Sequence, residues 1–87
     1  MTALKDDLLK AIGLALDDEW KAAHRLVQQA EADATASWIH AVLHKIEGDL
    51  DNSRYWYRRA GRLERLTDEP RAELAAIQAA ILAEATA

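Results

Sequence analysis

The chain has 87 residues, a net charge of −4 and no cysteine. A chain of this length forms one domain with a modest core, because small domains bury only about 60% of the surface that the extended chain exposes. Without cysteine, it has no disulfide and no thiolate to ligate a metal or attack a substrate. No stretch reaches the roughly 20 apolar residues of a membrane span, and residues 1–20 lack the apolar segment of a signal peptide. We therefore expect a cytoplasmic protein without a membrane partner.

Positive charge is concentrated between residues 54 and 65, where five arginines and one glutamate give a local charge of +4. Because the whole chain carries −4, the remaining residues carry −8. Nucleic-acid binding is usually the property of a basic domain. We therefore expect no nucleic-acid partner.

Apolar residues recur at helical spacing along the whole chain and predict an all-α fold with about five helices. The first helix is predicted over residues 3–15, with an inward face formed by Leu4, Leu8, Ala11, Ile12 and Ala15. Asp17 or Asp18 is expected to cap the second helix. The inward face of that helix is predicted to be Trp20, Ala23, Val27, Ala30 and Ala34.

The third helix is expected to begin at a Thr35 or Ser37 cap and to end at Gly48 in the left-handed conformation. Its predicted apolar face is Ile39, Val42, Leu43 and Ile46. Asp49 or Asp51 is expected to cap the fourth helix. The inward face of the fourth helix is predicted to be Ser53, Trp56, Ala60 and Leu63.

Gly61 ends or weakens the fourth helix, and Pro70 marks the start of the fifth, because proline is tolerated in a first turn. The inward face of the fifth helix is predicted to be Leu74, Ile77, Ile81 and Leu82. Its opposite face is formed by Ala72, Ala76, Ala79 and Ala83. These alanines indicate either close approach of a second copy in a homodimer or an exposed helix of high propensity. The second interpretation is slightly favoured.

Two segments 30 residues apart share a small, large, small pattern at positions i, i+4 and i+7. The first set is Ala23, Val27 and Ala30, and the second is Ser53, Tyr57 and Ala60. Each set follows an acidic turn within a predicted helix pair. The pattern therefore indicates an internal repeat of helix pairs.

With Ala41 and the Gly48–Asp49 turn, the second set resembles the tetratricopeptide repeat. The resemblance covers residues 5–62, although the proline after the second helix is missing and the period is shorter than the family's roughly 34 residues. It implies a single domain, residues 1–87. Its parts would be antiparallel helix pairs at residues 3–34 and 35–65 and a capping helix at 68–85. Residues 38–62 also resemble a WIHA, LH, EGD, YWYRRAG signature of small bacterial and fungal proteins, which implies no particular activity.

Histidines on the third helix are the first candidate for chemistry. His40 and His44 lie one turn apart, with Glu47 on the same side. Two imidazoles and a carboxylate form a potential open site for a divalent metal. His24 joins them only if the fold brings the second helix across. The favoured interpretation is that His40 and His44 pack against the fourth helix and bond to tyrosine or acidic neighbours.

Arginines and aromatic residues are the second candidate. Four arginines at i, i+4, i+8 and i+11 lie on one face if the fourth helix continues to residue 65: Arg54, Arg58, Arg62 and Arg65. Guanidinium groups bind carboxylates and phosphates in bidentate geometry. The alternative is a solvated face paired with Glu47, Asp51 and Glu64. Because Tyr55, Trp56 and Tyr57 span about 200° of a helix, we expect Tyr55 or Trp38 at an edge.

These observations favour a binding module over an enzyme, because the serines are in cap or packing positions and no Gly-rich phosphate loop occurs. We predict no catalytic residue and no cofactor, and a protein or peptide partner that is acidic or otherwise anionic. The predicted binding surface is Trp38, His40, His44, Tyr55, Arg58, Arg59 and Arg62. The alternatives are a metal- or ligand-binding enzyme centred on His40, His44 and Glu47, and a structural homo-oligomer.

Overall fold

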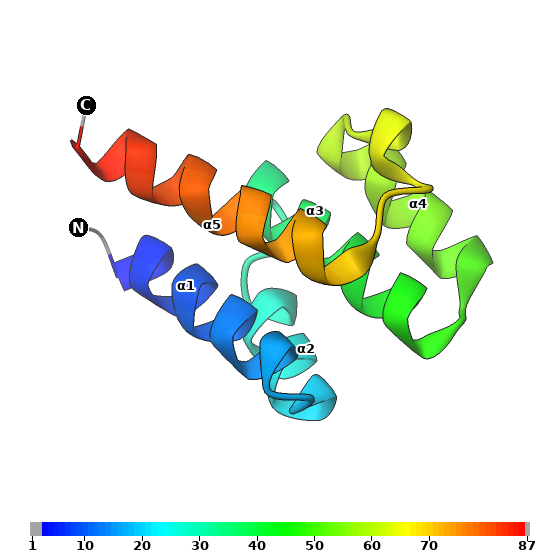
Figure 1. Cartoon of the computed structure of the whole chain (residues 1–87), viewed down its shortest axis with the longest axis horizontal. Coiled ribbons are helices and arrows are strands. Elements are labelled where there is room, and N and C mark those ends of the chain that lie inside the picture. The colour runs from blue at the N-terminus through cyan, green and yellow to red at the C-terminus, as the bar shows by residue number, and fades with distance from the viewer. Residues whose placement is uncertain (1–2, 87) are drawn as a thin grey trace.

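The computed structural model describes the backbone of residues 3–86 and the side chains of residues 3–84. It confirms the all-α fold with five helices, joined by short turns (Figure 1). The elements are α1 (Ala3–Leu16), α2 (Trp20–Gln28), α3 (Ala34–Glu47), α4 (Leu50–Ala60), the 3₁₀ turn η1 (Leu63–Arg65) and α5 (Pro70–Thr86). Within residues 3–86 no helix is long and apolar enough to cross a membrane.

The helices pack as two pairs, α1 with α2 and α3 with α4, while α5 packs along α1 and α3. Helix α5 runs back beside α1, so the start of α1 and the end of α5 lie on the same side of the molecule in Figure 1. Helix α3 contacts α1, α2, α4 and α5 and is therefore the central element. The assignment of this arrangement to the tetratricopeptide repeat stays a prediction.

Helix α3 is enclosed on all faces, because every residue from Ala36 to His44 is buried. Nine residues cover about two and a half turns, so the predicted single apolar face was too narrow. Ile46, assigned to that face, is 44% exposed. Large residues from the four neighbouring helices surround α3, namely Ile12, Val27, Tyr57, Leu74 and Ile77.

Local sequence signals at the C-terminal ends of α3 and α4 are confirmed. Gly48 and Gly61 follow these helices with φ of 86° and 70°, the left-handed conformation that glycine adopts without steric cost. Asp49 caps α4 by accepting a hydrogen bond from the backbone N–H of Asn52. Pro70 is the first residue of α5.

Predictions at both ends of α2 were wrong. Asp18 adopts φ of 63° and closes the end of α1, where the N–H of Glu19 bonds to the carbonyl of Leu14. Glu19, and neither aspartate, therefore occupies the N-cap position of α2. At the other end, Asp33 caps α3 in place of Thr35 or Ser37, by accepting a hydrogen bond from the N–H of Ala36 at 2.9 Å. Ala34, predicted to end α2, is the first residue of α3.

Three leucines predicted to face inward are exposed. Leu63 is 45% exposed, because α4 ends before it and no longer directs it toward the core. Leu82 is 44% exposed beside the buried Ile81, since adjacent residues on a helix lie about 100° apart. Leu4, at the start of α1, is 38% exposed.

A buried carboxylate that the sequence did not single out joins α3, α4 and α5. Glu73 is 2% exposed and accepts hydrogen bonds from the indole N–H of Trp38 and the hydroxyl of Tyr57, each at 2.7 Å. The ammonium of Lys45 forms an ion pair with it at 2.7 Å and donates to backbone carbonyls of Arg65 and Asp68. Burial and the Glu73 carboxylate raise the pKa of Tyr57, so its hydroxyl remains a donor.

We predict that Glu73→Gln destabilises the protein by about 3 kcal/mol or more, because it leaves the buried Lys45 ammonium without its counter-ion. The free energy of unfolding in urea measures the loss. The matched control is Glu64→Gln, at an exposed position, with an expected change within about 0.5 kcal/mol. Equal effects of the two substitutions would show that the buried ion pair does not hold these helices together.

Candidate metal centre

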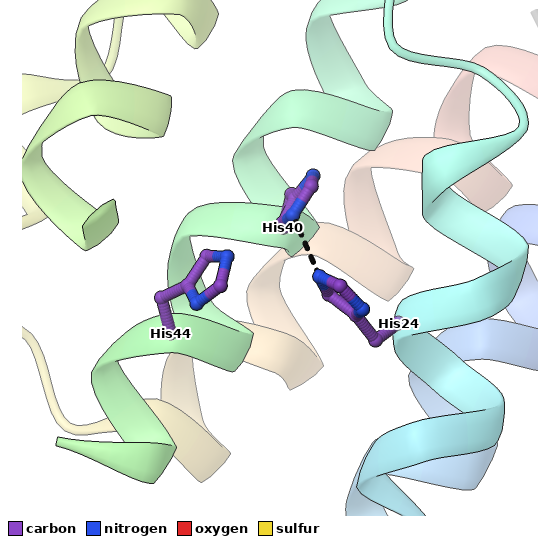
Figure 2. Close-up of side chains that lie close together, drawn as sticks. All are labelled: His24, His40 and His44. Atoms are coloured by element: carbon purple, nitrogen blue, oxygen red, sulfur yellow. Dashed lines mark hydrogen bonds between the residues drawn. The ribbon is translucent and has the colours of Figure 1, made fainter. Parts of the chain in front are cut away.

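All three histidines of the chain lie in one cluster between α2 and α3. His24 comes from α2, whereas His40 and His44 lie on successive turns of α3. Figure 2 shows the three imidazole rings facing one another across the space between the two helices. The fold therefore brings His24 to the pair that the sequence indicated.

The ring nitrogens are close enough to share one metal ion. The Nε2 atoms of His24 and His40 are 3.0 Å apart, and one nitrogen from each of the three rings lies within 4.8 Å of the others. Nitrogen ligands around tetrahedral zinc, at Zn–N distances of 2.0–2.1 Å, are separated by about 3.3 Å. The His24–His40 pair is already near that separation.

Glu47, a candidate ligand in the sequence analysis, contacts the ring of His44. Its Oε2 lies 2.7 Å from Nδ1 of His44 and accepts the proton on that nitrogen. The Nε2 atom of His44 therefore carries the lone pair, and no described residue donates a hydrogen bond to it. A carboxylate on the distal nitrogen is the usual arrangement of a metal-ligating histidine.

A second set of potential ligands lies on the other edge of His44. It comprises His44, Glu47 and Asp49, whose ligand atoms are also within 4.8 Å of one another. The carboxylate of Asp49 already accepts hydrogen bonds within the protein, because it caps α4 and accepts one from the side-chain amide of Asn52 at 2.6 Å. These hydrogen bonds lower the pKa of Asp49. The all-histidine set is therefore the better candidate.

Tryptophans hold the rings from two sides. The ring of His40 stacks on Trp56 of α4 at 3.9 Å between centroids, and that of His24 stacks on Trp20 at 4.6 Å. Trp20 is fixed in turn by a 2.6 Å hydrogen bond from its indole N–H to the carbonyl of Leu43. The predicted packing of His40 against the fourth helix is confirmed, but its nitrogen bonds to His24 and not to a tyrosine.

The electrostatic environment favours the uncharged form of two of the three imidazoles, His24 and His40. Burial, and to a smaller extent the neighbouring His24 and His44, together lower the pKa of His40 to about 3. Burial and His44 also lower the pKa of His24. Neutral imidazole is the form that binds a metal.

The remaining predicted site residues do not share one surface with these histidines. His40 and His44 are 3% and 8% exposed, and Trp38 is 6% exposed with its N–H bonded to Glu73. Tyr55, by contrast, is 48% exposed and is the aromatic at the edge. The other exposed members of the predicted surface are Arg58, Arg59 and Arg62.

The predicted arginine face on a single helix was also wrong. Helix α4 ends at Ala60 and Gly61 turns the chain, so Arg62 and Arg65 do not continue the row begun by Arg54. Arg54 pairs with Asp51 at 3.7 Å, as the solvated interpretation predicted.

Comparisons with protein-family models, curated proteins and solved structures found no match for this chain. Its function is therefore inferred from the geometry of the site.

We predict that the metal-free protein loses stability as the pH falls from about 6.5 toward 3. The folded-state pKa of His40 lies below its value of 6.5 in the unfolded chain. Between these values the unfolded chain binds more protons, so the free energy of unfolding decreases by up to about 1.4 kcal/mol per pH unit for this group.

Urea unfolding with a chelator present between pH 7 and 5 isolates this effect from most carboxylates, which titrate near pH 4. A His40→Gln variant lacks the titrating ring, so its stability is expected to fall less steeply over this range. Identical slopes for the two proteins would contradict the prediction.

Proposed function

We propose that this protein is a small helical metal-binding domain that holds one divalent transition metal on His24, His40 and His44. The observation that carries the proposal is the convergence of every histidine in the chain, with ring nitrogens within 4.8 Å of one another. The carboxylate of Glu47 on Nδ1 of His44 supports it.

The donor set limits the choice of metal. Imidazole nitrogen suits zinc, cobalt, nickel and copper, whereas magnesium and calcium prefer carboxylate and carbonyl oxygens. Three protein ligands leave a fourth position of a tetrahedral zinc site free for water or another ligand. His24 is only partly buried, whereas His40 and His44 are buried.

We assign no reaction to the site. The carboxylate of Glu47 is hydrogen-bonded to His44. The tryptophans that stack on the histidine rings, Trp20 and Trp56, have no side-chain group that acts as an acid or base. Binding would instead cross-link α2 to α3, because His24 is the ligand from α2. A ligand that binds only the folded state stabilises it by about 2.7 kcal/mol at 100 times its dissociation constant.

We predict that the purified protein binds one equivalent of zinc or cobalt, measured by isothermal titration and by elemental analysis after dialysis. His24→Asn, His40→Asn and His44→Asn each remove a ligand and are expected to lower affinity more than Glu47→Gln does. Loss of such an outer partner typically costs about 10–100-fold. The control Asp51→Asn, at an exposed carboxylate paired with Arg54, is expected to leave affinity unchanged.

A further variant distinguishes the two sets that include His44. Asp49→Asn retains an N-cap side chain for α4 but removes a carboxylate from the second set. Unchanged affinity in this variant supports the all-histidine site. The proposal is refuted if Asp49→Asn abolishes binding while His24→Asn does not, or if no variant of the three histidines changes affinity.

A further inference from the structure

Three arginines at or just beyond the C-terminal end of α4 form no ion pair with a carboxylate among the described side chains. Among the side chains of residues 3–84, none places a carboxylate within ion-pair distance of Arg58, Arg59 or Arg62. All three are exposed. The flanking arginines differ, since Arg54 pairs with Asp51 and Arg65 pairs with Asp68 at 3.0 Å.

Buried aromatic rings fix two of these guanidinium groups. Arg59 lies over the ring of Trp56, 5.0 Å from its centroid, and donates hydrogen bonds to the hydroxyl of Tyr55 at 3.2 Å and to the carbonyl of Glu31 at 3.4 Å. Arg62 lies over the ring of Trp38 at 4.6 Å. A stacked guanidinium keeps N–H donors in its plane for a bidentate partner. A side chain that is already ordered loses less entropy on binding.

The helix dipole explains only part of this pattern. Cations are favourable in the last turn of a helix, which accounts for the charge of Arg58 and Arg59. Arg62 follows the left-handed Gly61 and lies outside the helix. Lysine would satisfy the dipole equally, whereas stacking on tryptophan and bidentate recognition favour arginine. The geometry therefore fits recognition of a carboxylate-bearing partner.

We propose that Tyr55, Arg58, Arg59 and Arg62 form a docking surface for an acidic peptide segment, here called the arginine surface. The three positively charged arginines favour a negatively charged partner. An Asp- or Glu-rich peptide supplies several carboxylates within the short length of this surface. Tyr55 is 48% exposed, and tyrosine and arginine are enriched at interface hot spots.

A nucleic acid is the less suitable partner. Outside residues 54–65 the chain carries −8, and this charge repels the extended phosphate backbone of a polynucleotide. A short acidic peptide contacts only the arginine surface and avoids most of that repulsion. The proposal requires no metal, although Trp56 contacts both Arg59 and the ring of His40.

Fluorescence anisotropy with a labelled decapeptide of Asp and Glu tests the proposal at low salt. The variant Arg58→Ala/Arg59→Ala/Arg62→Ala is expected to lower affinity at least tenfold and to weaken its dependence on salt. The matched control, Lys10→Ala/Lys21→Ala/Arg25→Ala, removes the same charge from three exposed positions on α1 and α2. It is expected to change affinity less than threefold.

The single substitution Arg58→Ala controls for misfolding, because the exposed Arg58 side chain forms no hydrogen bond, ion pair or ring contact with the described residues. It is expected to lower affinity at least threefold with unchanged circular dichroism. Equal losses in the two triple variants, or no binding of the peptide at low salt, would overturn the proposal. Tighter binding of a single-stranded ten-base oligonucleotide would do the same, as would self-association in sedimentation equilibrium that the Arg58→Ala substitution abolishes.

Discussion

The enclosure of α3 is the constraint on which the rest of the structure depends. Because every residue from Ala36 to His44 is buried, each polar side chain on this helix needs a partner inside the protein. Ser37 donates to the carbonyl of Glu31, Trp38 donates to Glu73, and the two histidines bond to His24 and Glu47. In the described part of the chain, no buried side-chain nitrogen or oxygen lacks a partner.

These hydrogen-bond partners are of two kinds. Glu73 accepts from a tryptophan, a tyrosine and a lysine, so its carboxylate is satisfied entirely by the protein. The histidine cluster instead places three imidazoles together, with one hydrogen bond between His24 and His40 and no donor from the described residues on Nε2 of His44. A divalent metal bound as proposed would be coordinated by these imidazole nitrogens.

Local signals predicted most of the helices. Glycine, proline and capping side chains determine the backbone conformation only within a few residues, so their effect can be read from the sequence. The structure has helix ends at Gly48, Asp49, Gly61 and Pro70. The break between α2 and α3 was misplaced because residues 28–34 contain neither glycine nor proline. Only the capping side chain of Asp33 marks the boundary, and nearby Thr35 and Ser37 offer the same chemistry.

Contacts between residues that are far apart in the chain could not be predicted from a single sequence. Glu73 resembles an ordinary acidic residue in a first turn, and its burial depends on packing against Lys45 and Tyr57, which precede it by 28 and 16 residues. The spacing of His40 and His44 was visible, but the approach of His24 depends on how α2 crosses α3. The sequence therefore indicated two of the three proposed ligands, together with Glu47, which bonds to His44.

X-ray absorption at the zinc edge of the zinc-loaded protein tests the central claim most directly, because it reports the atoms bound to the metal. The three-histidine site predicts a first shell at about 2.0–2.1 Å with three imidazole nitrogens, and outer-shell scattering from the rings that decreases in the His24→Asn variant. A shell of mainly carboxylate and water oxygens with at most one imidazole would contradict the account.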